Sequence, residues 1–224
     1  MGERDMRTFL FLAAAMLASS GVLADGPRPT TGSAAPRHRV VHASKAQTLY
    51  DQMGDDSGNG INSQNFEEQY DAYDDEAADD FIVPDGVRWK ITEVDMAGYY
   101  NEGPADNMTV TFYKDRHGRP GRLVKQFTVV APDSGLDGSF PIDLDGSVTL
   151  KPGHYWVSIV ADQRFDFAGE WSWAVSDTGA VNEPAMWRNP GGGFAIGCTE
   201  WTAVTTCVDY LKGDYLFALK GRVR

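Results

Sequence analysis

The stretch that decides the fold is FIVPDGVRWKITEVDM, residues 81–96. After its Pro-Asp-Gly turn, apolar and polar side chains alternate, which is typical of a β-strand with one buried face. The inward positions change phase by one residue between Ile91 and Val94. A slip of this kind predicts a β-bulge near Thr92 and Glu93.

The same alternation continues outward along the chain. It recurs at 108–112, 140–144, 155–159, 171–175 and 215–219. Turn signals rich in Gly, Pro, Asp and Asn separate these runs. They lie at 84–86, 115–121, 137–138, 145–146, 151–153, 189–191 and 212–214. About eight to ten short strands at this spacing predict an all-β antiparallel sandwich or barrel, and no segment after Phe81 has a helical period.

The N-terminal residues 1–24 are typical of a signal peptide. Their apolar run ends in Ala24, a small residue of the kind that signal peptidase requires before the cleaved bond. We expect cleavage after Ala24. The true start is either Met1 or Met6, and the acidic residues before Met6 suit an export signal poorly.

Residues 25–47 are rich in Pro, Ser, Ala and Gly and lack periodicity, so we expect a disordered linker. The sandwich domain is then expected over residues 48–224. No run outside the signal reaches the roughly 20 apolar residues that a membrane span needs. We therefore expect a secreted or periplasmic protein without a membrane span.

The formal net charge is −12, from 32 acidic and 20 basic residues. A charge this negative argues against nucleic acid as a partner, because nucleic-acid binding depends on a basic footprint. Most of the acidity lies in residues 51–80, which contain eleven acidic residues and no Lys or Arg. This acidic segment is where we would look first for a bound cation or a basic partner.

Calcium is the candidate cation, since it takes six to eight oxygen ligands. Residues 55–60 resemble the start of an EF-hand loop, but Phe66 occupies the twelfth position and Glu67 comes one residue late. A looser site could use the nearby carboxylates, which are Asp71, Asp74, Asp75, Glu76, Asp79 and Asp80. The alternative is a solvated acidic arm, with Asp79 or Asp80 hydrogen-bonded to backbone where the first strand begins.

Two cysteines, Cys198 and Cys207, are separated by eight residues. In an oxidising compartment this spacing favours a local disulfide, worth about 2 to 3 kcal/mol in the chain-entropy model. A zinc site is the weaker alternative because the four histidines show no metal-binding spacing near the cysteines.

Several strings resemble a family of exported bacterial β-sandwich domains. They are SQNFE (63–67), DAYDDEAADDFIVPDGVRWKITEVDMAGYY (71–100), GRPG (118–121), LKPGHYWVSI (150–159) and WRNPGGGF with the two cysteines (187–207). The resemblance covers residues 50 to 224 and implies a jelly-roll-like accessory domain of poorly defined function. The chain departs from those relatives in ending at Arg224 without a sorting helix, which favours a free secreted protein.

The aromatic residues form a second candidate site, because an exposed indole can stack on a sugar ring or an apolar partner. Trp187 and Trp201 flank Gly191–Gly193 and the cysteines, and we expect them to lie at the surface. Tyr99 and Tyr100 are further candidates for ligand binding. Trp171 and Trp173 are expected in the core. The triple glycine lacks the Lys and the helix that a phosphate loop requires.

No catalytic motif is present. The sequence contains neither a G-x-S-x-G elbow nor an H-E-x-x-H motif, and no free cysteine is expected. Glu93, Glu170 and Glu200 could supply a carboxylate pair for glycoside hydrolysis, but such residues are too common to be informative. We predict that the protein is not an enzyme.

Three functions remain open. The first is a secreted non-catalytic module that binds an extracellular carbohydrate or protein, with calcium as a stabilising ion. The second is a structural component of a cell surface or matrix that self-associates through a bare edge strand. The third is a hydrolase of an unrecognised type. A buried set of tryptophans would count against the first.

Overall fold

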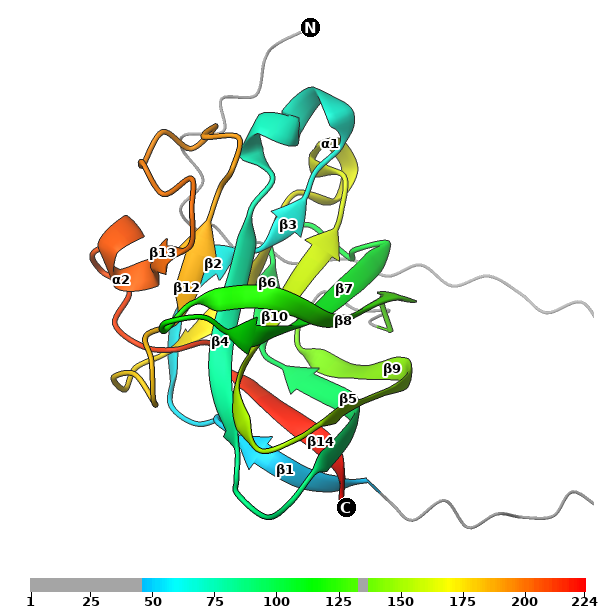
Figure 1. The fold of residues 1–224 in the computed structure, drawn as a ribbon. Coiled ribbons are helices and arrows are strands. Elements are labelled where there is room, and N and C mark those ends of the chain that lie inside the picture. The colour runs from blue at the N-terminus through cyan, green and yellow to red at the C-terminus, as the bar shows by residue number, and fades with distance from the viewer. Residues whose placement is uncertain (1–45, 133–136) are drawn as a thin grey trace, which may run out of the picture. The chain divides into compact units, whose positions relative to one another are not determined.

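The computed structural model describes residues 46–132 and 137–224, and all of these belong to one unit. The expected signal peptide and all but the last two residues of the expected linker lie outside the described residues. The described part contains fourteen strands (Figure 1). They are β1 (Gln47–Asp51), β2 (Asp56–Asn62), β3 (Gln64–Asn65), β4 (Glu76–Val83), β5 (Trp89–Met96), β6 (Gly98–Tyr100), β7 (Asn107–Asp115), β8 (Pro120–Val130), β9 (Phe140–Leu150), β10 (Gly153–Asp162), β11 (Trp171–Ser176), β12 (Met186–Arg188), β13 (Thr202–Ala203) and β14 (Phe217–Val223).

The strands form three sheets. A four-stranded sheet has the order β1-β14-β5-β9, and a three-stranded sheet has the order β2-β11-β6. A seven-stranded sheet has the order β13-β12-β4-β10-β7-β8, with β3 pairing beside β10. All pairs are antiparallel except β3 with β10, where Gln64 lies opposite Ala161. The predicted all-β antiparallel sandwich is therefore confirmed.

Aromatic residues join the inner faces of the three sheets. Phe81 of β4 stacks on Trp89 of β5, with ring centroids 6.2 Å apart, and so connects the seven-stranded to the four-stranded sheet. Trp173 of β11 stacks on Tyr215 at 4.7 Å and meets Phe217 of β14 at 6.1 Å. All five side chains are buried, so the sheets share one hydrophobic core.

The predicted bulge in β5 is confirmed. The register between β5 and β14 shifts where Glu93 lies opposite Lys220 and Ile91 lies opposite Gly221, which leaves Thr92 as the extra residue. The turn predicted at Asp145–Gly146 is wrong, because β9 continues through both residues. Asp145 has a φ of 45°, and the pairing of β9 with β5 is interrupted between Asp143 and Val148. The Asp-Gly pair therefore marks an irregularity inside β9 and not the end of the strand.

The acidic segment 51–80 is not a solvated arm. It contributes β2, β3 and β4 to the sheets, together with a 3-10 helix, η1 (Glu68–Tyr73). The predicted backbone contact is present, because Asp79 accepts a hydrogen bond from the N–H of Tyr215 at 2.7 Å. Strand formation buries Asp79 in β4, which the acidic composition alone could not indicate.

Helix is confined to short turns. Besides η1, the described chain has two helices of four residues each, α1 (Phe165–Ala168) and α2 (Val204–Cys207). The sequence predicted no helix after Phe81. A single turn is too short to produce a hydrophobic period in the sequence. Among the described residues no helix is long and apolar enough to cross a membrane.

Candidate functional site

The described surface has a groove of about 410 Å³ on the outer face of the seven-stranded sheet. It runs over β4, β10 and β7 and reaches β8, and we refer to it as the sheet groove. A second hollow, of about 530 Å³, lies beside the turn before β5 and has fewer polar side chains in its lining. Thr111 pairs with Gln126 across β7 and β8, so these two side chains lie on one face and both line the groove. Thr109 and Asp162 continue the lining toward β3. Strand alternation thus places a row of polar side chains above the core.

A fixed hydrogen-bond network forms one wall of the sheet groove. The Glu76 carboxylate accepts hydrogen bonds from Tyr113 Oη at 2.7 Å and Ser158 Oγ at 2.8 Å. Arg188 donates to the other Glu76 oxygen from Nε at 3.1 Å and from an amino nitrogen at 2.5 Å. The Arg188 guanidinium also lies 4.4 Å from the ring centre of Trp201. Burial raises the pKa of Tyr113, and the Glu76 charge adds to the shift.

The other end of the groove carries acceptors. Asp162 accepts a hydrogen bond from Asn65 Nδ2 at 3.0 Å and one from Thr109 Oγ1 at 3.4 Å. Asp74 accepts the N–H of Phe66 at 2.8 Å, and burial raises its pKa. The Arg188 guanidinium, which donates hydrogen bonds, and the Asp162 carboxylate, which accepts them, therefore both line the sheet groove.

The glycine-rich loop builds the rim of the groove, where Pro190 is part of the lining. Asn189 Nδ2 donates to the carbonyl oxygens of Ala72 at 2.9 Å and of Asp74 at 2.8 Å. Gly193 N–H donates to the Ala72 carbonyl at 2.7 Å, and a Cβ on Gly193 would lie 2.6 Å from that oxygen. The glycine thus permits close backbone approach between this loop and η1.

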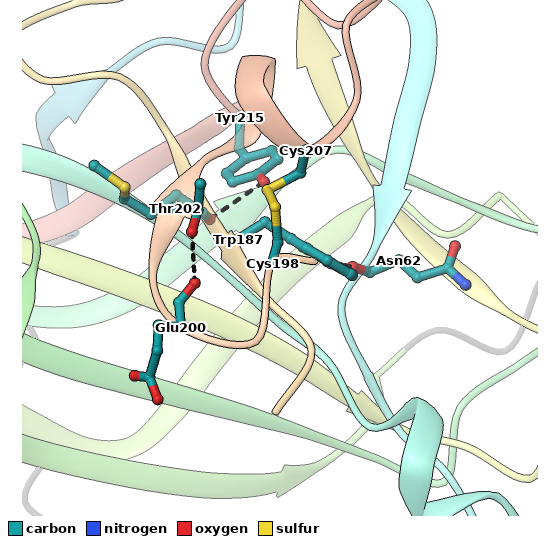
Figure 2. Close-up of a disulfide and its surroundings, with 8 residues drawn as sticks. Asn62, Trp187, Cys198, Glu200, Thr202, Cys207 and Tyr215 are labelled. Atoms are coloured by element: carbon teal, nitrogen blue, oxygen red, sulfur yellow. Dashed lines mark hydrogen bonds between the residues drawn. A yellow bond between two sulfur atoms is a disulfide. The ribbon is translucent and has the colours of Figure 1, made fainter. Parts of the chain in front are cut away.

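The predicted disulfide between Cys198 and Cys207 is present, with Cα atoms 6.0 Å apart. Figure 2 shows the Trp187 side chain beside this disulfide and directed toward Asn62. The Trp187 indole Nε1 donates to the Asn62 carbonyl at 2.8 Å. The Asn189 N–H donates to the Cys198 carbonyl at 2.8 Å, so the disulfide loop and the groove rim are directly connected.

The expectation that Trp187 and Trp201 lie at the surface is wrong. Their exposed fractions are 2% and 9%, and all six tryptophans are buried, including the core pair predicted at positions 171 and 173. Trp187 packs in the main core, and Trp201 packs with Trp156 on the outer face of the seven-stranded sheet. The sequence shows the alternation of side chains along a strand, but it does not show which outer faces of the sheet are covered by loops.

Tyr99 and Tyr100 are half-buried in β6 of the three-stranded sheet, apart from the residues that line the groove. Tyr99 Oη donates to the Asp56 carboxylate at 2.5 Å, while Tyr100 Oη accepts the Ala105 N–H at 3.1 Å. The four aromatic residues predicted for ligand binding are therefore not brought together into one site.

The five aspartates predicted to bind calcium are not arranged as a site. Within residues 46–132 and 137–224, no group of three or more His, Cys, Asp or Glu side chains could hold a metal ion. Asp79 and Asp80 are neighbours in a strand and point to opposite faces of β4. Asp75 accepts the Gln64 N–H at 2.8 Å, and Asp71 is exposed on η1. The acidic residues are close together in the sequence, which predicted a shared calcium site. In the structure, the alternation of side chains along β4 directs two of them to different faces.

A second polar cluster on the outer face was not expected. His154 Nε2 contacts the buried Asp80 carboxylate, and its Nδ1 lies 3.7 Å from Asp115. Asp115 also accepts the indole N–H of Trp156 at 3.0 Å. Burial raises the pKa of Asp80 to about 6, while the hydrogen bond and charge of His154 act in the opposite direction. The cluster joins β4, β10 and β7, and only the pairing of these strands brings it together.

The glutamates considered for hydrolysis lie on separate elements. Glu93 accepts a hydrogen bond from Lys220 Nζ at 2.8 Å in the four-stranded sheet. Glu170 accepts one from Asn62 Nδ2 at 2.7 Å before β11, and Glu200 is exposed near the disulfide (Figure 2). None of the three lines the sheet groove.

The sequence matches no protein-family model, and comparisons with curated proteins and with solved structures return no match. The resemblance to exported bacterial β-sandwich domains therefore stays a prediction.

Proposed function

We propose that the protein is a secreted, non-catalytic module that binds a carbohydrate in the sheet groove. The burial of all six tryptophans counts against stacking of a sugar on an exposed indole, so the proposal is one of binding through hydrogen bonds. The observation that carries the proposal is the groove itself, a hollow of about 410 Å³ lined by donors and acceptors from adjacent strands. Sugar hydroxyl groups both donate and accept hydrogen bonds. The hydroxyl groups of Thr109 and Thr111, the amide of Gln126 and the carboxylate of Asp162 offer matching partners.

The fixed wall of the groove supports binding. Glu76 is held by Tyr113, Ser158 and Arg188, so these side chains do not have to be ordered when a ligand arrives. Pre-organised side chains lower the entropic cost of association. The half-buried Tyr113 ring, together with Val160 and Pro190, adds an apolar surface to the lining.

The disulfide supports the proposed location. Disulfides persist in secreted and periplasmic proteins and are rare in reducing compartments. The Cys198–Cys207 bond and the apolar N-terminal segment both favour export.

Glycan-array binding of the full chain tests the proposed function. Gln126 is exposed and forms no side-chain hydrogen bond within the described residues, so Gln126→Ala removes a ligand contact without a structural cost. We expect this variant to bind the selected glycan about tenfold more weakly, the loss of one hydrogen bond of roughly 1.4 kcal/mol. Gln47→Ala, the same change at an exposed position of β1 outside both hollows, is the matched control and should bind like the wild type.

Two results would overturn the proposal. One is that no glycan on the array binds; the other is that Gln126→Ala and Asp162→Asn both bind as tightly as the wild type. Chromatography of the glycan after incubation tests the non-catalytic part, and the appearance of cleaved products would refute it.

A further inference from the structure

The hairpin formed by β7 and β8 is strongly basic although the protein carries a net charge of −12. Residues 114–125 contain five basic side chains, Lys114, Arg116, Arg119, Arg122 and Lys125, and one acidic residue, Asp115. We call this set the basic hairpin. Its three arginines and Lys125 are exposed, and β8 forms an outer edge of the seven-stranded sheet (Figure 1).

The turn holds two of these charges side by side. His117 and Gly118 have φ values of 58° and 72°, which is the left-handed geometry of a two-residue hairpin turn. The Arg116 N–H donates to the Arg119 carbonyl at 2.9 Å, so the two arginines occupy directly opposite positions. Like charges at opposite positions of a ladder repel each other, so this arrangement costs stability unless an anion lies nearby.

Within residues 46–132 and 137–224, no acidic side chain forms an ion pair with the three arginines. The five ion pairs within the described residues involve His154, Arg188 and Lys220 as the cations. Asp115 is occupied by the indole N–H of Trp156 and the N–H of Gly118. Glu183 lies beside Gly118, yet it forms no ion pair with an arginine of the hairpin.

We propose that the basic hairpin binds an anionic polysaccharide, one that carries carboxylate or sulfate groups along its chain. A flexible polyanion of low charge density can contact the hairpin alone. A phospholipid surface or a nucleic-acid duplex presents dense charge to much more of the protein, whose net charge of −12 opposes the approach. The alternative is that the basic side chains only prevent edge-to-edge pairing between copies of the protein, a role that needs no ligand.

Binding of the full chain to sodium polygalacturonate, measured by titration calorimetry at two salt concentrations, tests the proposal. The triple variant Arg116→Ala/Arg119→Ala/Arg122→Ala should bind at least about tenfold more weakly than the wild type, and its affinity should depend less on salt. The control Lys90→Ala/Arg164→Ala/Lys212→Ala makes the same change in net charge at scattered positions and should retain binding.

The groove variant Gln126→Ala separates this proposal from the proposed function. Unchanged polygalacturonate binding by Gln126→Ala, together with loss in the triple arginine variant, supports the basic hairpin as a separate site. Equal weakening in the two triple variants, or loss only in Gln126→Ala, overturns it. Tighter binding to a DNA duplex or to anionic phospholipid vesicles than to polygalacturonate also overturns it. So does wild-type protein that fails to bind polygalacturonate at low salt.

Discussion

Asp79 and Tyr215 are 136 residues apart in the sequence, and the Asp79 carboxylate accepts the Tyr215 backbone N–H at 2.7 Å. The same oxygen accepts a hydrogen bond from Gln52 Nε2 at 2.8 Å, and the second oxygen accepts the Asp80 N–H at 2.7 Å. One buried side chain therefore joins β4 to the segments after β1 and before β14. Burial raises the Asp79 pKa well above its usual range, and repulsion from Asp214 and Asp80 adds to the shift.

Replacing Asp79 should destabilise the fold. Asp79→Ala removes the side-chain acceptor of the buried Tyr215 and Asp80 N–H groups, and Gln52 Nε2 keeps only the Tyr215 carbonyl. We expect the free energy of unfolding to fall by about 2 to 4 kcal/mol, even though the cost of a buried carboxyl is relieved. Urea unfolding measures the change. Asp85→Ala, which removes an exposed carboxylate from the turn before β5, should change stability by less than about 0.5 kcal/mol. Equal stability of the two variants would contradict the assigned role of Asp79.

The burial of Asp80 predicts a pH dependence of stability. Burial raises the Asp80 pKa from its ordinary value of 3.8 to about 6, so the folded state binds this proton more tightly than the unfolded state does. The stability from this group is fully present below pH 3.8 and is lost as the pH rises through about 6. The loss is at most about 3 kcal/mol.

Urea unfolding of the wild type and of Asp80→Asn at pH 4 and pH 7 measures this contribution. Asn has no carboxyl proton to lose, so the decrease in stability between the two pH values should be smaller in the variant. Other buried carboxyl groups, including Asp75 and Asp79, remain in both proteins and cancel in the comparison. An identical decrease in the two proteins would rule out a perturbed Asp80.

Loss of the disulfide should lower stability by about 2 to 3 kcal/mol, because the closed loop restricts the unfolded chain. Cys198→Ser/Cys207→Ser should therefore melt at a lower temperature than the wild type. Treatment of the wild type with dithiothreitol should lower its melting temperature similarly, whereas the serine variant should not respond. A wild-type melting temperature unchanged by reduction would show that the bond contributes little.

The glycine-rich loop offers a matched pair of substitutions. A Cβ at Gly193 would lie 2.6 Å from the Ala72 carbonyl oxygen, whereas a Cβ at Gly54 meets nothing within 4 Å. Gly193→Ala should therefore cost about 1 to 3 kcal/mol and displace the rim of the sheet groove, while Gly54→Ala should be close to neutral. Thermal melts and glycan binding of both variants check this. Tolerance of Gly193→Ala would mean that the loop does not depend on close contact with Ala72.

Local patterns predicted the parts of the fold that are decided locally. The alternation around Ile91 and Val94 predicted both the strand β5 and its bulge, because a phase slip changes which side chains can face the core. The spacing of the two cysteines favoured the disulfide. These features depend on residues within about ten positions of one another.

The candidate site depends on pairing between distant strands, and the sequence could not show it. Thr111 and Gln126 become neighbours only through the β7–β8 register. The acidic residues looked solvated because composition shows charge but not the donors that Tyr215 and Gln52 bring to Asp79. Trp187 was expected at the surface because nothing in its own segment shows that the Asn62 carbonyl receives its indole N–H.

The pairing of β1 with β14 places the two ends of the described domain next to each other, with Gln47 opposite Gly221. A short linker from Arg224 back to Gln47 would therefore give a circular permutant with the same three sheets. New ends could open at the exposed Gly179, around which a Cβ would meet nothing within 4 Å. The three sheets thus depend on which strands pair with each other and not on where the chain begins and ends.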